Sequence, residues 1–131
     1  MAELDRMVRS GSLEWTADID AASYVNGKRE TLNGEGVAKP ADAWRRYREG
    51  CSLRLSWPQK HSEPIWRLIS LLEEFFGCGG GANVYATPPG NKQGFAPHWD
   101  DIDAWILQLD GAKRWRVYAP LSINETLPRY S

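Results

Sequence analysis

Residues 83–118 read NVYATPPGNKQGFAPHWDDIDAWILQLDGAKRWRVY, and this stretch decides the fold class. Asn83–Thr87 is rich in residues that favour strands and stops at a Pro-Pro pair, which predicts a β-strand. His98–Leu109 and Lys113–Tyr118 also have the pattern of strands, and the turn pair Asp110-Gly111 lies between them. We therefore expect this half of the chain to be mainly β and antiparallel.

The residues before this stretch indicate helices and two further strand regions. Pro40–Gly50 has a proline near its start and a glycine just past its end, as helices often do. Glu63–Phe76 follows Ser62, a good N-cap, and repeats apolar residues at helical spacing, so we expect it to pack that stripe on a core. Cys51–Trp57 alternates as a strand does, and Ser23–Leu32 suggests a hairpin around Asn26-Gly27. The expected fold class is α+β or mainly β, with a helical prelude.

Composition excludes several classes of protein. The chain has 131 residues, of which 42% are hydrophobic and 25% charged, and this suits one globular domain. No apolar run approaches the roughly 20 residues of a membrane helix, so no membrane association is expected. The net charge of −1 argues against a protein that coats nucleic acid.

A basic cluster at Arg45, Arg46 and Arg48 is either an RNA contact or the solvated face of a helix. Two cysteines, Cys51 and Cys78, are expected to be free thiols, mostly buried.

The tripeptide His98-Trp99-Asp100 is the sharpest chemical feature of the chain. Residues i and i+2 of a strand point to the same face, so an imidazole and a carboxylate can be aimed at one point. These are two of the three protein ligands in the facial triad of non-haem Fe(II) oxygenases. Such a short motif also arises by chance, so from spacing alone the alternative is a hydrogen-bonded pair on the surface.

Three ordered segments around this motif resemble the Jumonji-C ribosomal oxygenases, in particular their eukaryotic nucleolar branch. They are residues 83–89, 93–101 and 107–118, and the resemblance extends over nearly the whole chain. It implies a double-stranded β-helix of the cupin type that binds Fe(II) and uses 2-oxoglutarate as cosubstrate. Residues 1–78 would be the N-terminal part of the Jumonji-C region, and residues 79–131 the first strands of the β-helix. The nucleus and nucleolus are the location that the resemblance implies.

The resemblance also implies roles for individual residues. His98 and Asp100 would be iron ligands, and Lys113 would pair with the distal carboxylate of 2-oxoglutarate, a chemistry that suits a compact ammonium group. Asn83 and Tyr85 would line the cosubstrate pocket. Without the resemblance, Lys113 reads as a solvated lysine of a strand, and Asn83 and Tyr85 as a turn-proximal amide and a cross-strand aromatic.

The second ligand histidine of the family lies on a later strand, downstream of Ser131. We therefore expect the chain to be a fragment of the catalytic domain, truncated before the β-helix is complete. The other histidine, His61, precedes a predicted helix and reads as a polar surface residue rather than a replacement ligand.

The expected activity is hydroxylation of a protein side chain by dioxygen. The substrate would be a histidine of a ribosomal protein or a methyl-lysine of a histone tail, and any homodimer would form through regions outside this chain. Acidic residues Asp101, Asp103 and Asp110 are either a rim for such a basic peptide or solvated strand edges. The alternative function is a non-catalytic cupin fragment that binds a peptide, because the third metal ligand is absent from the sequence.

Overall fold

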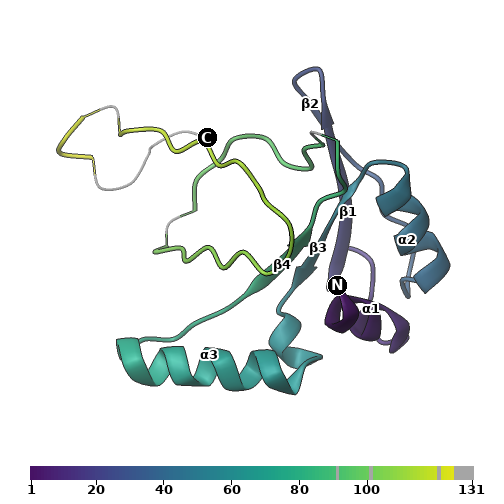
Figure 1. Cartoon of the computed structure of the whole chain (residues 1–131), viewed down its shortest axis with the longest axis horizontal. Helices are drawn as coiled ribbons and strands as arrows, with labels where there is room; N and C mark the ends of the chain where they lie inside the picture. The colour runs from purple at the N-terminus through teal and green to yellow at the C-terminus, as the bar shows by residue number, and fades with distance from the viewer. Residues whose placement is uncertain (91, 101, 121, 126–131) are drawn as a thin grey trace. The chain divides into compact units, whose positions relative to one another are not determined.

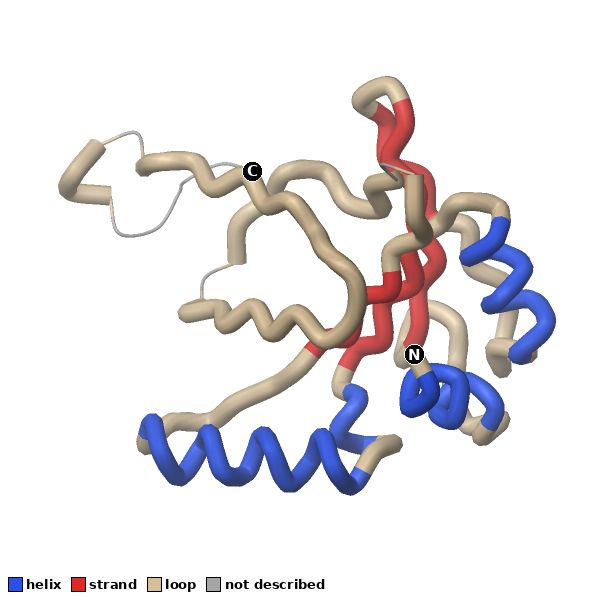
Figure 2. The backbone as a smooth tube through the Cα atoms, viewed as in Figure 1, coloured by secondary structure: helices blue, strands red, loops and turns tan. Residues whose placement is uncertain are grey.

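The computed structural model describes residues 1–90, 92–100, 102–120 and 122–125. It divides the chain into two compact units, Met1–Ala96 and Pro97–Ser131. All helices and strands of the described residues belong to the first unit (Figures 1 and 2). The predicted division of the chain at residues 78 and 79 stays a prediction.

A four-stranded antiparallel sheet forms the centre of the first unit, with the strand order β2-β1-β3-β4. The strands are β1 (Ile19–Val25), β2 (Lys28–Thr31), β3 (Ser52–Ser56) and β4 (Asn83–Ala86). The predicted hairpin is confirmed, since Asn26 and Gly27 connect β1 to β2 with positive φ angles of 53° and 77°. Two successive residues with positive φ form the kind of turn that suits the twist of a hairpin. The predicted strands 51–57 and 83–87 are confirmed as β3 and β4.

In the described part of the chain, three α-helices and a short 3-10 helix accompany the sheet. They are α1 (Ala2–Arg9), α2 (Pro40–Arg48), η1 (Pro58–Lys60) and α3 (Glu63–Phe76). Sequence analysis predicted α2 and α3 but missed α1, whose polar sequence contains only three buried apolar residues, Leu4, Met7 and Val8. Their spacing of three and one is that of a single helical face. No helix in the described part of the chain has the length and apolar character needed to cross a membrane.

The hydrophobic core lies between one face of the sheet and the helices α1 and α2. Alternation along the strands places Leu53 and Leu55 of β3 on this face, beside Ile19 and Ala21 of β1. The opposite face receives the intervening residues, which are mostly polar. The sheet therefore has an apolar face that packs in the core and an opposite face that carries polar side chains.

Helix α3 corrects one prediction. None of its residues is buried, and Leu71 and Phe75 are 64% and 80% exposed. Only Ile65, in its first turn, packs against the core. The helix is apolar on several sides, and η1 is the element of the described residues that it contacts most. The predicted packing of its whole apolar stripe on the core is therefore wrong.

The second unit corrects another prediction. The described residues of 97–125 include no strand, although 98–109 and 113–118 were predicted as strands. Trp105, Leu109 and Val117 are largely exposed there. Alternation fits a residue pattern to a strand, but the strand forms only when a neighbouring backbone supplies hydrogen bonds. The described residues of this stretch belong to none of the β-ladders, and they have no regular secondary structure.

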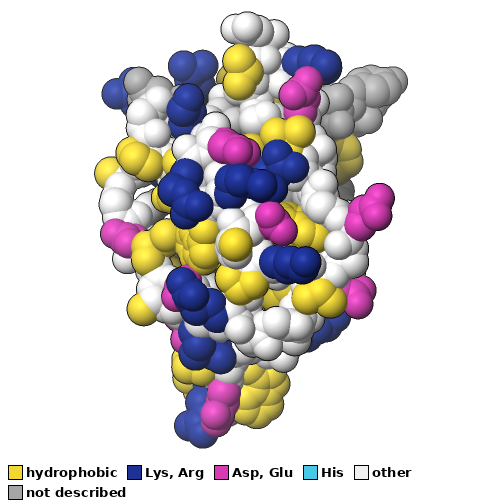
Figure 3. All heavy atoms as spheres, turned by 90° about the vertical axis from the view of Figure 1, so that its right-hand side faces the viewer, with side chains coloured by type: hydrophobic (Ala, Val, Ile, Leu, Met, Phe, Trp, Pro, Cys, Tyr) yellow, Lys and Arg dark blue, Asp and Glu magenta, His cyan; other side chains and the backbone are white. Residues whose placement is uncertain are grey.

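The basic cluster of α2 is largely neutralised by acidic neighbours. Arg45 lies 2.9 Å from Asp42, and Arg46 lies 3.6 Å from Glu49. Figure 3 shows this face of the molecule, where Lys and Arg side chains alternate with Asp and Glu. The arrangement favours the interpretation as the solvated face of a helix.

Both cysteines are free as predicted, although Cys51 is buried and Cys78 is exposed.

Candidate active site

The polar face of the sheet carries two of the predicted pocket residues. Asn83 and Tyr85 are two residues apart in β4 and share that face, where Asn83 pairs with Ser56 and Tyr85 pairs with Arg54 of β3. Their neighbours Val84 and Ala86 pack on the core instead. Tyr85 is partly exposed and lies edge-on to the ring of Phe95, with ring centroids 5.4 Å apart.

A buried carboxylate organises the middle of this face. Asp20 of β1 is only 5% exposed, and it accepts hydrogen bonds from the Arg54 guanidinium and from Asn33 Nδ2, the latter at 2.7 Å. Asn33 also accepts a bond of 2.9 Å from the backbone of Ala21. Charge-assisted bonds of this kind compensate for the cost of burying the carboxylate.

Sequence analysis missed this Asp20–Asn33–Arg54 network. The alternation of Ser52–Ser56 already placed Arg54 on the face opposite Leu53 and Leu55. Its partners could not be identified from the sequence, because the pairing depends on the register between β1 and β3.

The second unit contains the predicted metal ligands. His98 Nε2 and Asp100 Oδ2 lie 3.9 Å apart, and both side chains are partly exposed. The two donors thus lie close together although the segment is not a strand. Among the residues described, no group of three or more His, Cys, Asp and Glu side chains is placed to hold a metal ion.

Lys113 also belongs to the second unit. Its Nζ lies 5.0 Å from the ring centroid of Trp115, in a cation–π contact. The side chain keeps access to solvent, but neighbouring atoms partly desolvate the ammonium group and lower the pKa of Lys113 below its usual value. The convergence of Lys113, Asn83, Tyr85 and the His98–Asp100 pair on one pocket stays a prediction.

His61 has a structural environment of its own. Its Nε2 lies 3.6 Å from Asp18 Oδ1, and its backbone oxygen accepts a hydrogen bond from Arg6. The side chain is half-buried, so the predicted surface position is only partly right. Asp103 and Asp110 are exposed, whereas Asp101 lies outside the described residues.

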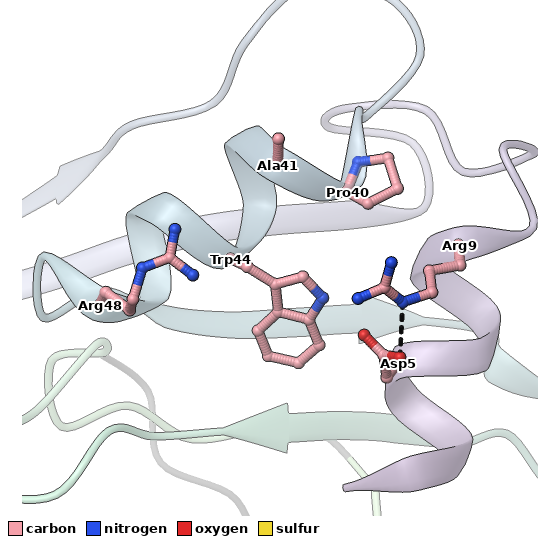
Figure 4. Close-up of a pocket in the computed structure, with 6 residues that line it drawn as sticks. All are labelled: Asp5, Arg9, Pro40, Ala41, Trp44 and Arg48. Atoms are coloured by element: carbon pink, nitrogen blue, oxygen red, sulfur yellow. Dashed lines mark hydrogen bonds and ion pairs between the residues drawn. The ribbon is translucent and has the colours of Figure 1, made fainter.

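A surface groove lies apart from these residues, between α1 and α2. Its volume is about 650 Å³, and it is lined by Asp5, Arg9, Pro40, Ala41, Trp44 and Arg48. Figure 4 shows the indole of Trp44 between Arg48 and the Asp5–Arg9 ion pair, whose atoms are 2.6 Å apart. None of the predicted site residues lines this groove.

An antiparallel sheet with one polar face, helices on the other face and a following His-x-Asp pair together define part of a cupin-type fold. The chain belongs to the JmjC domain family, whose model matches residues 54–130. The matched region includes β4 and all five predicted site residues.

Curated relatives are similar to this chain over almost its whole length. It is 53% identical to ribosomal oxygenase 1 of Homo sapiens over 126 residues, which are 96% of this chain and 20% of that protein. It is 50% identical over 128 residues to a protein of Dictyostelium discoideum named bifunctional lysine-specific demethylase and histidyl-hydroxylase, covering 98% of this chain and 25% of that protein. The chain thus spans about a quarter or less of the length of these relatives.

Proposed function

We propose that this chain is part of the catalytic domain of an Fe(II)- and 2-oxoglutarate-dependent oxygenase that hydroxylates a protein side chain. The observation that carries the proposal is the His98–Asp100 pair, with donor atoms 3.9 Å apart inside the stretch that matches the JmjC family. An imidazole nitrogen and a carboxylate oxygen are a donor set that suits non-haem Fe(II). The pair fits two of the protein ligand positions of such a site.

When Fe(II) and 2-oxoglutarate are bound, they supply the oxidative chemistry, in which dioxygen and 2-oxoglutarate give succinate, CO2 and one hydroxyl group on the substrate. The residues of this chain hold and orient the reactants. His98 and Asp100 would bind the metal. The ammonium group of Lys113 would hold the distal carboxylate of 2-oxoglutarate, and its partial desolvation strengthens attraction to an anion.

The polar side of the sheet would provide the wall of the cosubstrate pocket. Asn83 and Tyr85 would present an amide and a phenol to 2-oxoglutarate from neighbouring positions on one face of β4. Arg54, which pairs with Tyr85 in the sheet, is held in place by the buried Asp20 carboxylate. A preorganised polar wall lowers the cost of orienting a charged cosubstrate.

The proposed substrate class is a basic peptide whose target side chain is a histidine or a methylated lysine. The names of the relatives, ribosomal oxygenase and histidyl-hydroxylase with lysine-specific demethylase, support this class. The exposed carboxylates Asp103 and Asp110 would favour a basic peptide by charge complementarity.

The experiment is metal binding by the intact protein that contains this sequence. Mn(II), a redox-inert probe for Fe(II), is titrated in the presence of 2-oxoglutarate and followed by electron paramagnetic resonance. We expect His98→Ala and Asp100→Ala each to weaken binding by at least tenfold, whereas Asp103→Ala, a nearby exposed carboxylate, leaves binding unchanged. Unaltered binding in both ligand variants would reject the site, and binding of substrate peptide without any 2-oxoglutarate turnover would favour a non-catalytic cupin.

A further inference from the structure

The backbone of the segment Gln93–Phe95 is hydrogen-bonded to the edge of strand β1. The amide of Tyr24 in β1 donates a hydrogen bond of 2.7 Å to the carbonyl oxygen of Gln93. The pairing of β1 with β3 ends at Ala22 and Ser52. Beyond this pair, Gln93 takes the place of β3 beside the edge of β1. Its bond satisfies a backbone donor that would otherwise lack a partner in the sheet.

Gly94 permits a very close approach of this segment to the sheet. A Cβ atom at this position would lie 3.0 Å from the backbone oxygen of Ala22 and closer still to the side chain of Ser52. Gly94 is buried by this contact. A residue with any side chain would push the segment away, so the glycine is required for the observed position.

Phe95 then places its ring among the functional side chains of the polar face. The ring is edge-on to Tyr85, and the guanidinium carbons of Arg29 and Arg54 lie 4.9 Å and 5.8 Å from its centroid. Arg54 is bound by Asp20 through one terminal nitrogen, while its buried Nε has no hydrogen-bond partner in the described part of the chain. The Phe95 ring and the Asp20 carboxylate thus hold the guanidinium from two directions.

We propose that Gln93–Phe95 is a strap that positions Tyr85 and Arg54, and that Phe95 is a positioning residue for the 2-oxoglutarate site. The inference rests on the proposed function, because it takes Tyr85 as part of the cosubstrate pocket. Phe95 acts through the orientation of its neighbours. It sets the rotamer of the Tyr85 phenol by an edge-to-face contact and restrains the guanidinium by a cation–π contact. The strap ends at Phe95, shortly before His98 in the sequence.

The test uses Phe95→Leu, which keeps apolar bulk but removes the ring, and Phe95→Tyr, which keeps the ring. The first readout, in the intact protein without metal, is hydrogen exchange of the Tyr24 amide. The Ala21 amide serves as internal reference because it is bonded to Asn33 and not to the strap. The second readout is binding of 2-oxoglutarate to the Mn(II)-loaded protein by calorimetry.

We expect Phe95→Leu to accelerate Tyr24 exchange relative to Ala21 and to weaken 2-oxoglutarate binding roughly three- to tenfold, with both restored in Phe95→Tyr. Gly94→Ala is expected to reproduce both effects because it displaces the strap. A lowered melting temperature with unchanged 2-oxoglutarate affinity would mean a purely structural role and would overturn the inference. Unchanged Tyr24 exchange in both strap variants would overturn it as well.

Binding of 2-oxoglutarate by the unmodified protein tests the proposed function separately. If the unmodified protein binds no 2-oxoglutarate, the proposed function and the positioning role both fail. The exchange measurement still decides whether the strap is attached through Phe95.

Discussion

The ionisable side chains of the chain differ in how far they are buried and in which neighbouring groups they contact. Asp20 is buried and bound by two partners, whereas His98 and Asp100 stay partly exposed with their donors facing each other. Lys113 lies between these cases, because its ammonium group is partly desolvated and contacts the ring of Trp115. The two partners of Asp20 compensate for the cost of burying its charge.

Replacing Lys113 with alanine is expected to weaken 2-oxoglutarate binding roughly tenfold to a hundredfold, the range for a charge-assisted contact. The measurement is calorimetric titration of the Mn(II)-loaded intact protein, with Arg114→Ala as the control for loss of a neighbouring positive charge. Binding should also weaken as pH rises through the lowered pKa of Lys113, since only the ammonium form attracts the carboxylate. Equal affinities for the Lys113 and Arg114 variants would contradict the assigned role.

Replacing Arg54 with alanine is expected to destabilise the fold by about 3 kcal/mol, because it leaves the buried Asp20 carboxylate without its main partner. Urea unfolding measures this change. The control is Lys28→Ala, which breaks the exposed Lys28–Glu30 pair and should cost under about 0.5 kcal/mol. A similar cost in the two variants would show that Asp20 does not depend on Arg54.

The secondary-structure elements show where the sequence signals were sufficient. The hairpin of β1 and β2, the strands β3 and β4, and the helices α2 and α3 follow from turn pairs, alternation and helical spacing. Helix α1 was missed because it is short and its three core residues stand among charged ones. Ser62 shows that the sequence predicted the position of a helix cap but not its hydrogen bond. It is the N-cap of α3 by position, but its hydroxyl donates to Glu3 of α1 instead of accepting a helix amide.

This contact between α1 and the start of α3 makes a prediction about acid stability. Hydrogen bonds from Arg6 and then from Ser62 lower the pKa of Glu3 from 4.5 to about 2. The folded state therefore releases this proton more readily than the unfolded state. The stabilisation from Glu3 is fully present above the unfolded pKa and is lost as pH falls through the folded pKa.

Glu3→Gln is accordingly expected to destabilise the protein near neutral pH and to converge on the unmodified protein as pH falls from 4.5 to about 2. Thermal unfolding at a series of pH values measures the difference. Glu35→Gln, at an exposed loop position, controls for the loss of one negative charge. A stability difference that stays constant over this range would show that Glu3 gains nothing from its contacts.

At the scale of the whole molecule, the two units differ in how well the sequence predicts them. In Met1–Ala96, local patterns and the core agree, because each strand has a neighbour and the sheet has helices to cover its apolar face. In Pro97–Ser131, the alternating residues have no described partner strand, so the same kind of pattern led to an incorrect prediction. Partner-dependent structure is not encoded in a local pattern.

The candidate site shows the same division. His98 and Asp100 lie 3.9 Å apart although the segment is not the expected strand, and their role as metal ligands stays a prediction. The Asp20–Arg54 network and the strap at Gln93–Phe95 depend on sheet register and close packing, and the sequence alone did not reveal them. The region that matches the JmjC family, residues 54–130, contains the five predicted site residues, and their convergence on one pocket stays a prediction.

The most direct test of the proposed oxygenase is isotopic labelling of its product. The intact protein is supplied with Fe(II), 2-oxoglutarate, ¹⁸O2 and a histidine-containing peptide of a ribosomal protein, and the peptide is analysed by mass spectrometry. We expect uptake of one labelled oxygen atom together with succinate formation, and neither in His98→Ala. Equal labelling in His98→Ala, or an unlabelled hydroxyl group in the product, would contradict the proposed oxygenase site.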